Sequence, residues 1–185
     1  MTFGERVVGA LKLDANTFED IERDPTAMGQ AVAIIALAAL AGSLGALWRL
    51  GFGSMLFSVC ASLVGYLLWS VVVWAVGTKV MPDPATKADF AETFRTIAFA
   101  ASPGLIGVIT IVPLLGSVLY FLLTPVIMIW SLIAMVVAVR QVLDYTETFK
   151  AVIVVLIGFA VYIVFWFVTA MLSFGAALFG GMFSR

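Results

Sequence analysis

Long runs of apolar residues, separated by short polar stretches, make up most of the sequence. A helix needs about 20 mostly apolar residues to cross a membrane, and five runs reach that length. We therefore predict an all-α membrane protein, a five-span transmembrane helical bundle with short amphipathic N-terminal helices. The predicted spans cover residues 27–47, 54–80, 90–111, 115–139 and 148–174.

The domain organisation follows from these runs. Residues 1–26 form an amphipathic N-terminal segment, predicted to be cytoplasmic, and residues 27–185 form the five-span membrane domain. A sixth span would require the last run to be split, and no turn residue interrupts that run before Gly175. The Gly-rich stretch from Gly175 onward is expected to be a frayed extension of the last span or an interfacial segment.

The N-terminal segment has the pattern of helices that lie on a membrane surface. Phe3, Val7 and Leu11 recur four residues apart, which places them on one face of a helix. A second short helix is predicted to begin with Asn16 as its N-cap, because Glu19 three residues later would complete a capping box. We interpret these helices as an anchor on the inner leaflet or on the bundle. The alternative is that they form a docking site for a cytoplasmic protein partner.

The distribution of lysine and arginine predicts the orientation of the bundle, because cytoplasmic loops of multi-pass proteins carry most of these residues. With a cytoplasmic N-terminus, eight of the ten basic residues fall on the inner side. They are Arg6, Lys12, Arg23, Lys79, Lys87, Arg95, Arg140 and Lys150. Arg49 and Arg185 fall on the outer side. We expect a multi-pass protein of the cell inner membrane, with its C-terminus opposite to its cytoplasmic N-terminus.

Composition supports a lipid environment and disfavours several kinds of chemistry. The chain is 63% hydrophobic and 11% charged, whereas soluble domains carry about 25% charged residues. The net charge of −1 gives no basic surface for nucleic acid. The sequence has no histidine, and its single cysteine, Cys60, lies in an apolar run, where it is expected to pack as a small apolar residue. We therefore predict no metal site, no cofactor and no catalytic residue.

Proline interrupts two of the predicted spans. In the third span, Ser102, Pro103 and Gly104 break the helix, and Pro103 leaves the carbonyl of residue 99 without an amide partner. Such a carbonyl is costly in lipid, so the break should face the bundle interior, with Ser102 as the candidate hydroxyl to meet it. Thr124 and Pro125 repeat the arrangement in the fourth span. The two bent helices are expected either simply to pack together or to line a small polar cavity.

Charged residues gather at the inner ends of the same two spans. Arg95 lies three residues after Glu92, about one turn inside the third span, and Arg140 lies four residues before Asp144. If these spans are antiparallel neighbours, the four side chains meet near the cytoplasmic surface. One interpretation is an interfacial salt-bridge network, and another is a binding patch for phosphate, a lipid headgroup or a protein. A third, an intramembrane enzyme with a metal between Glu92 and Asp144, is disfavoured by the flanking arginines.

Small residues recur at helical spacing within the spans. Ala38 and Gly42 share a face in the first span, and Ala100, Gly104 and Gly107 do so in the third. Membrane helices approach each other closely through such faces. We expect these faces to pack within one bundle, and the alternative is packing between copies in a homo-oligomer. The remaining apolar surface is expected to contact membrane lipids.

Several landmarks together resemble a known family. Residues 93–116, TFRTIAFAASPGLIGVITIVPLLG, join a charged helix start to an A-x-x-P break and a P-x-x-G turn. Trp130 follows in the next apolar run, and residues 132–152, LIAMVVAVRQVLDYTETFKAV, carry an AxR…T…KA pattern. These features resemble the Yip-domain (Ypt/Rab-interacting protein) integral membrane family, and most of all its bacterial branch. The resemblance covers nearly the whole chain and implies five spans, a cytoplasmic N-terminus and no enzymatic activity.

The resemblance also bears on function. Eukaryotic relatives bind small GTPases and act in vesicle traffic, but neither their long cytoplasmic N-terminal region nor their DLYGP signature is found in this sequence, so we do not expect GTPase binding. We expect a non-enzymatic membrane scaffold or adaptor, for membrane organisation or trafficking-like roles. The alternative is a passive channel or transporter for a small solute, ion or lipid through the Pro-broken third and fourth spans. No charged residue lies at the middle of a predicted span, which argues against a proton-coupled pump.

Overall fold

The computed structural model describes residues 1–183, with side chains described through Leu172 except at positions 46, 49 and 117. The described chain is built from helices, in this order: α1 (Phe3–Leu11), α2 (Ala15–Arg23), the 3-10 turn η1 (Pro25–Ala27), α3 (Met28–Leu50), α4 (Phe52–Ala75), the π-helical turn η2 (Val76–Val80), α5 (Phe90–Ala100), the 3-10 helix η3 (Ser102–Ile111), α6 (Leu115–Val142) and α7 (Thr148–Phe183). Residues 175–183, expected to fray or to lie at the interface, continue α7, and Arg185 lies outside the described residues.

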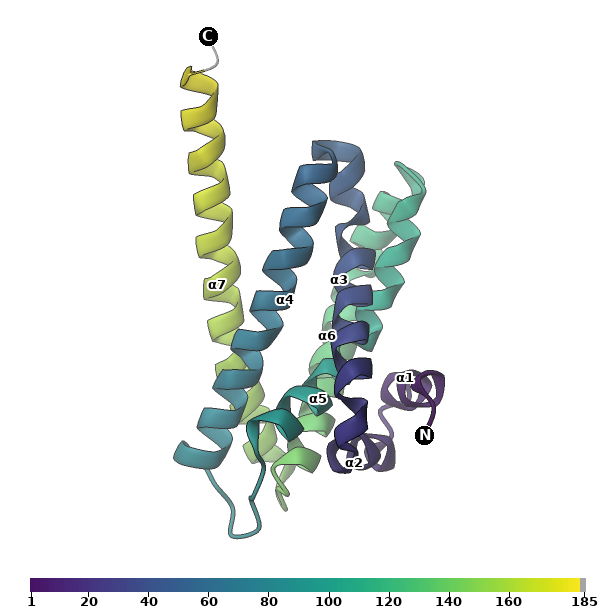
Figure 1. Ribbon diagram of the computed structural model, residues 1–185, viewed down its shortest axis with the longest axis vertical. Coiled ribbons are helices and arrows are strands. Elements are labelled where there is room, and N and C mark those ends of the chain that lie inside the picture. Colours follow the sequence, from purple (N-terminus) through teal and green to yellow (C-terminus); the bar gives the residue numbers. More distant parts are fainter. Residues whose placement is uncertain (184–185) are drawn as a thin grey trace.

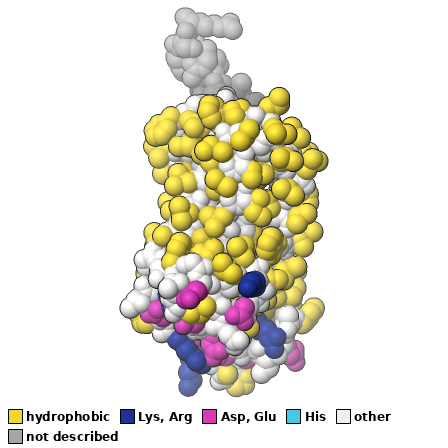
Figure 2. All heavy atoms as spheres, turned by 90° about the vertical axis from the view of Figure 1, so that its right-hand side faces the viewer, with side chains coloured by type: hydrophobic (Ala, Val, Ile, Leu, Met, Phe, Trp, Pro, Cys, Tyr) yellow, Lys and Arg dark blue, Asp and Glu magenta, His cyan; other side chains and the backbone are white. Residues whose placement is uncertain are grey.

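The long helices run between two ends of the molecule (Figure 1). Four helical stretches are long and apolar enough to cross a membrane, namely Pro25–Gly45, Phe52–Val80, Val118–Val142 and Thr148–Leu172. The pair formed by α5 and η3, bent by 44°, makes a fifth crossing if it is counted as one span. In Figure 2 the charged side chains gather at the end that holds the N-terminal helices, below a tall apolar band. The prediction of an all-α membrane bundle is confirmed.

The third span continues after its break as a 3-10 helix rather than as a kinked α-helix. Pro103 supplies no N–H at the break, and the buried Ser102 hydroxyl donates to the Phe99 carbonyl at 2.6 Å, as the sequence predicted. The Gly104 N–H donates to the Ala101 carbonyl at 2.9 Å, which starts the tighter winding. A 3-10 run of 10 residues is unusually long, so contacts with neighbouring helices must hold it.

Small residues provide those contacts between η3 and α3. A Cβ atom added at Gly107 would lie 2.8 Å from the backbone of Ala41 and Gly42, and one at Gly104 would lie 3.4 Å from the Ala38 Cβ. The two backbones are therefore as close as glycine permits. The small faces expected on the first and third spans pack against each other inside the bundle.

The N-terminal helices α1 and α2 lie against the charged end of the bundle (Figure 1). Phe18 and Ile21 of α2 are fully buried. The Phe3 ring of α1 meets the Phe99 ring of α5 edge-on, with centroids 6.1 Å apart. The segment therefore packs on the bundle, which is one of the two anchoring places expected for it.

The predicted N-cap of α2 is wrong. The N-cap lies two residues earlier, at Asp14, so that α2 begins at Ala15, and the Asp14 carboxylate accepts from the Asn16 N–H at 3.3 Å. The same carboxylate accepts from the Thr17 hydroxyl at 2.7 Å. An ionised carboxylate is a strong acceptor at a helix N-terminus, so Asp14 takes the position that the Asn16–Glu19 spacing had suggested for Asn16.

Candidate functional site

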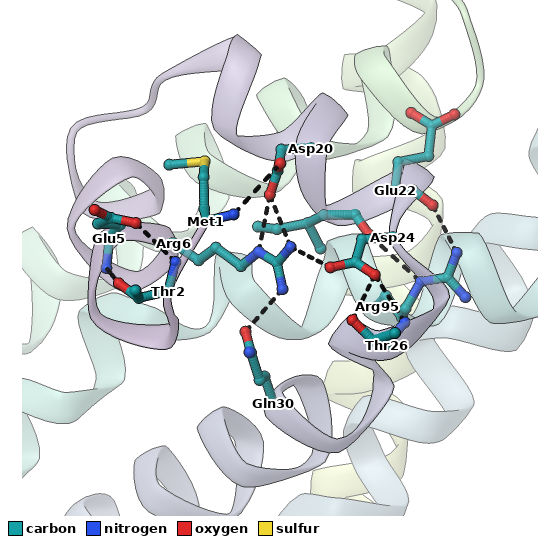
Figure 3. A network of polar contacts seen from close by, with 11 residues as sticks. Met1, Thr2, Glu5, Arg6, Asp20, Glu22, Asp24, Thr26, Gln30 and Arg95 are labelled. Carbon is teal, nitrogen blue, oxygen red and sulfur yellow. Dashed lines mark hydrogen bonds and ion pairs between the residues drawn. The ribbon is translucent and has the colours of Figure 1, made fainter.

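Arg95 of α5 is buried at the charged end of the bundle, with 5% of its surface exposed. Its guanidinium donates to main-chain carbonyls of α2, through Nε to Ile21 at 3.4 Å and through a terminal nitrogen to Glu22 at 2.6 Å (Figure 3). These carbonyls belong to the last turn of α2, where the helix dipole favours a positive charge. Arg95 therefore fastens α2 to α5.

The other three residues of the predicted network lie at the same end, and no ion pair links any of the four among the described residues. Glu92 accepts from the Asp89 N–H at 2.9 Å, and Asp89 accepts from the Glu92 N–H at 2.7 Å, which completes a capping box on α5. Arg140 donates to the Tyr145 carbonyl at 3.4 Å. Asp144 has a φ of 51° in the turn after α6. A functional role for these residues stays a prediction.

Two residues of the predicted network, Glu92 and Asp144, act electrostatically on Glu22. This half-buried side chain of α2 has its pKa raised to about 7, first by burial and then by the negative charges of Asp144 and Glu92. In Figure 3 its carboxylate points away from the Arg95 guanidinium, which holds only its main-chain carbonyl. Within the described chain, no group of three or more His, Cys, Asp or Glu side chains is arranged to hold a metal ion.

Arg6 of α1 forms a second buried centre that the sequence analysis did not single out (Figure 3). It is 1% exposed, and its guanidinium donates to Asp20 at 2.9 Å, Gln30 at 2.9 Å and Asp24 at 2.5 Å. Hydrogen bonds from Thr26, and then from Arg6, hold the pKa of the Asp24 carboxyl below its usual value. Arg6 thus connects α1 to α2, to the turn before α3 and to α3 itself.

Asp83 holds the loop between α4 and α5 against the start of α7. It is 7% exposed, forms an ion pair with Lys150, and accepts from the Thr146 N–H at 3.4 Å and hydroxyl at 3.3 Å. Lys150 and then the Thr146 N–H hold the pKa of Asp83 below its usual value. The Tyr145 hydroxyl donates to the Met81 carbonyl at 2.7 Å. Thr146 and Lys150 are landmarks of the resemblance, and here both bind Asp83.

These contacts make one continuous surface at the charged end. We call it the polar platform, defined as α1, α2 and the loops 81–89 and 143–147. Arg6 joins α1 to α2, Asp83 joins the two loops, and Arg95 fastens α2 to α5 beneath them. A platform held by buried charged groups has few alternative arrangements, because separating any pair would leave a charge buried without its partner.

The two proline breaks occupy different environments. Pro103 is buried and Gly104 lines an interior cavity, whereas Thr124 and Pro125 lie on the exposed side of α6. The Thr124 hydroxyl donates to the carbonyl of Tyr120, one turn earlier, at 2.8 Å. The breaks therefore do not face each other, because the inner face of α6 is the one that carries Tyr120 and the residues seven and eleven positions after it.

The interior cavity is partly open to the surface, has a volume of about 350 Å³ and lies among α3, α4, η3, α6 and α7. Its lining consists of Ala38, Ala39, Gly42, Ser43, Ser58, Ser62, Tyr66, Gly104, Tyr120, Ile127, Ser131, Tyr162 and Trp166. Of the five break residues predicted to line a cavity, Gly104 is in this lining and the other four are not. The repeated hydroxyl residues of α4, at Ser58, Ser62 and Tyr66, are the sequence signal that could have located it.

Cys60, expected to pack as a small apolar residue, is exposed on α4. It lines an apolar groove between α4 and α7 together with Phe57, Val64 and Phe165. Apolar residues dominate the outward surface here, as expected for helices that contact lipid.

A described chain built of long apolar helices, with most of its charged residues gathered at one end below a tall apolar band, defines an integral membrane protein of the multi-pass class. Within this class, the family model described as the Yip1 domain matches residues 9–182, and the chain belongs to the Yip1-domain family. No curated protein and no solved structure matches the chain. The match extends from the end of α1 into α7, so the cavity and all of the polar platform except most of α1 lie within it.

Proposed function

We propose that this protein is a non-enzymatic scaffold or adaptor of the inner membrane, which holds a protein partner or a second copy of itself on the polar platform. The observation that supports this most is the construction of the platform. Its buried charged groups, Arg6, Arg95 and Asp83, are each engaged in joining chain segments. Groups engaged in this way suit a fixed docking surface better than acid–base chemistry. The excess of lysine and arginine on this side favours a cytoplasmic location for it.

The outer side of α1 offers a surface for such a partner. Met1 and Val8 are about half exposed, at 53% and 49%. They border a shallow hollow of about 520 Å³ that Glu5, Lys12 and Asp14 also line. An exposed apolar patch rimmed by charges is typical of protein contact surfaces.

The test is isolation of the tagged protein from its own cells in native lipid, followed by cross-linking and mass spectrometry. We expect a partner protein or a second copy to be cross-linked to α1, and Val8→Glu to reduce that cross-linking at least tenfold. Leu50→Glu is the matched control, because Leu50 is 73% exposed at the opposite end of the bundle. If neither a partner nor a second copy is recovered, or if Val8→Glu leaves recovery unchanged, the proposal is wrong.

A passive pathway for a small uncharged solute is the second candidate, supported by the hydroxyl-lined cavity within the bundle. Solute flux into liposomes that contain the protein tests it. Gly104→Leu should reduce the flux, because Gly104 lines the cavity. Flux unchanged by Gly104→Leu and by Pro103→Ala, in protein that remains folded, would remove this candidate.

A further inference from the structure

The interior cavity is polar but carries no charge. Seven of its thirteen lining residues have a hydroxyl group, and none of the thirteen has an ionisable acid or amine. The hydroxyls come from α3, α4, α6 and α7, so all four long helices contribute to one polar environment. The cavity lies about midway along α4 and α6, at the depth where a bilayer offers no hydrogen-bonding partner.

Five of the seven hydroxyls fall into two groups by their hydrogen bonds. Ser43, Ser58 and Ser62 donate to carbonyls of their own helices at 3.0, 2.9 and 2.8 Å. Their hydrogens are engaged, so these serine oxygens remain as acceptors. The hydroxyls of Tyr66 and Tyr120 form no hydrogen bond to another residue in the described part of the chain. They remain as donors, and the cavity therefore presents acceptors and donors together.

This arrangement restricts what occupies the cavity. An apolar occupant would leave the tyrosine hydroxyls unpaired in a low-dielectric interior, which is costly. An ion or a phosphate would lie there without a countercharge. The volume of about 350 Å³ far exceeds the roughly 10–15 Å³ that one water needs, so a small polar molecule fits.

We infer that the cavity binds an uncharged molecule with adjacent hydroxyl groups, of the glycerol type. Each hydroxyl of such a molecule both donates and accepts, which matches the serine acceptors and the tyrosine donors. The same chemistry is available from two sources, the headgroup of a monoacylglycerol in the bilayer and free glycerol. The inference does not rest on the scaffold function, because the cavity lies outside the polar platform.

The experiment uses the full chain in phosphatidylcholine nanodiscs and has one arm for each source. In the lipid arm, a monoacylglycerol with a photoreactive acyl chain is cross-linked and the labelled peptides are mapped. In the soluble arm, binding of free glycerol is measured by saturation-transfer NMR. Tyr66→Phe and Tyr120→Phe each remove a donor at nearly constant volume and should weaken binding about three- to tenfold.

A filling variant and a matched control complete the design. Gly42→Leu should abolish binding, since a Cβ at Gly42 would lie 3.8 Å from the Tyr120 hydroxyl with the cavity beyond it. Ser70→Ala should leave binding unchanged, because Ser70 donates to a carbonyl of α4 at 2.9 Å as Ser62 does but lies outside the lining. Thermal unfolding of each variant verifies that it is folded.

Each outcome either supports or overturns the inference that the cavity binds a glycerol-type molecule. Labelling of cavity peptides by the lipid probe supports the inference with a bilayer source, and a glycerol signal alone supports it with a soluble source. Absence of both signals overturns it. Signals that are unchanged by both tyrosine variants also overturn it. This test remains valid if Gly42→Leu does not fold.

Discussion

Arg6 and Arg95 bury their guanidinium groups at the charged end and satisfy them in different ways. Arg6 is met by two carboxylates and an amide, whereas Arg95 is met by main-chain carbonyls at the end of α2. A guanidinium has five N–H donors in a fixed plane, so it can hold several acceptors from different segments at once. A lysine at either position would present one compact ammonium and could not span the same acceptors.

Glu22 gives the platform a dependence on pH. Its pKa is raised to about 7 from the value of 4.5 that an unperturbed glutamate has. The folded protein therefore binds this proton more tightly than the unfolded protein does, and the free energy of unfolding should fall as pH rises from about 5 to about 7. The facing charged groups that set this pKa are Asp144, Glu92, Arg23 and Glu19. Glu22→Gln should flatten this fall, which we expect to be about 1 kcal/mol or less, because the side chain is half exposed.

Melting temperatures in nanodiscs at pH 5, 6, 7 and 8 measure the effect. Glu5→Gln is the control, because the pKa of Glu5 is lowered by its hydrogen bonds to Thr2. The pKa values of Asp24 and Asp83 are also lowered, so the stability that these carboxylates contribute is lost only as pH falls below this window. An equal slope for Glu22→Gln and the unaltered protein would show that Glu22 does not titrate in this range.

At the residue scale, the sequence predicts hydrogen bonds that depend on spacing along the chain and misses those that depend on docking. The Ser102 hydroxyl could be assigned to the Phe99 carbonyl because both lie within one helical turn. The partners of the buried Arg6 and Arg95 could not be assigned in this way. They lie 14 to 24 residues from Arg6 and 73 to 74 residues from Arg95 in the chain. An arginine inside a predicted span indicates that a partner is needed, but does not identify it.

At the scale of elements, the packing of η3 on α3 depends on Gly107. An added Cβ would lie 2.8 Å from backbone atoms of Ala41 and Gly42, which cannot move aside as a side-chain end can. We expect Gly107→Ala to destabilise the protein by about 1–3 kcal/mol through this overlap. Thermal unfolding in nanodiscs measures the change.

Gly29→Ala on α3 is the matched control, because a Cβ at Gly29 would have no atom within 4 Å. We expect it to leave the melting temperature unchanged or to raise it slightly, since alanine favours the helix. Equal stability of Gly107→Ala and the unaltered protein would contradict the close packing of the two backbones.

The positions of the elements could be read from the sequence, and their exact conformations could not. The apolar runs reveal the spans because lipid requires each crossing to be long, apolar and internally hydrogen-bonded. Pro103 reveals a break, but the 3-10 winding after it depends on contact with α3. The predicted spans 54–80 and 90–111 leave residues 81–89 as their connection, yet the role of Asp83 in it depends on Lys150 of α7, 67 residues later.

At the scale of the whole molecule, the sequence separates two regions by their chemistry. Most charged residues lie at the end that holds the polar platform, and the cavity gathers uncharged hydroxyls within the apolar band. Both arise from the same requirement, because a polar group in a bundle must face water or another part of the protein. A polar cavity at the proline breaks was one of the predicted alternatives, but of its lining only Gly104 was identified from the sequence. The other lining residues were missed because serine and tyrosine do not interrupt an apolar run and α6 has no distinctly polar face.

The arrangement of crossings predicts which loops are reached from each side of the membrane. In Figure 1 the α3–α4 loop and the turn before α6 lie at the end opposite to the polar platform. We expect single cysteines at Gly53 and at Leu114, each introduced into a Cys60→Ser background, to react with a membrane-impermeant maleimide. The reagent is added to cells in which the outer face of this membrane is accessible. A cysteine at Lys87, in the platform loop, should react only after the membrane is opened. If α5 and η3 formed a re-entrant loop instead of a crossing, Leu114→Cys would behave like Lys87→Cys, and the bundle would have four spans.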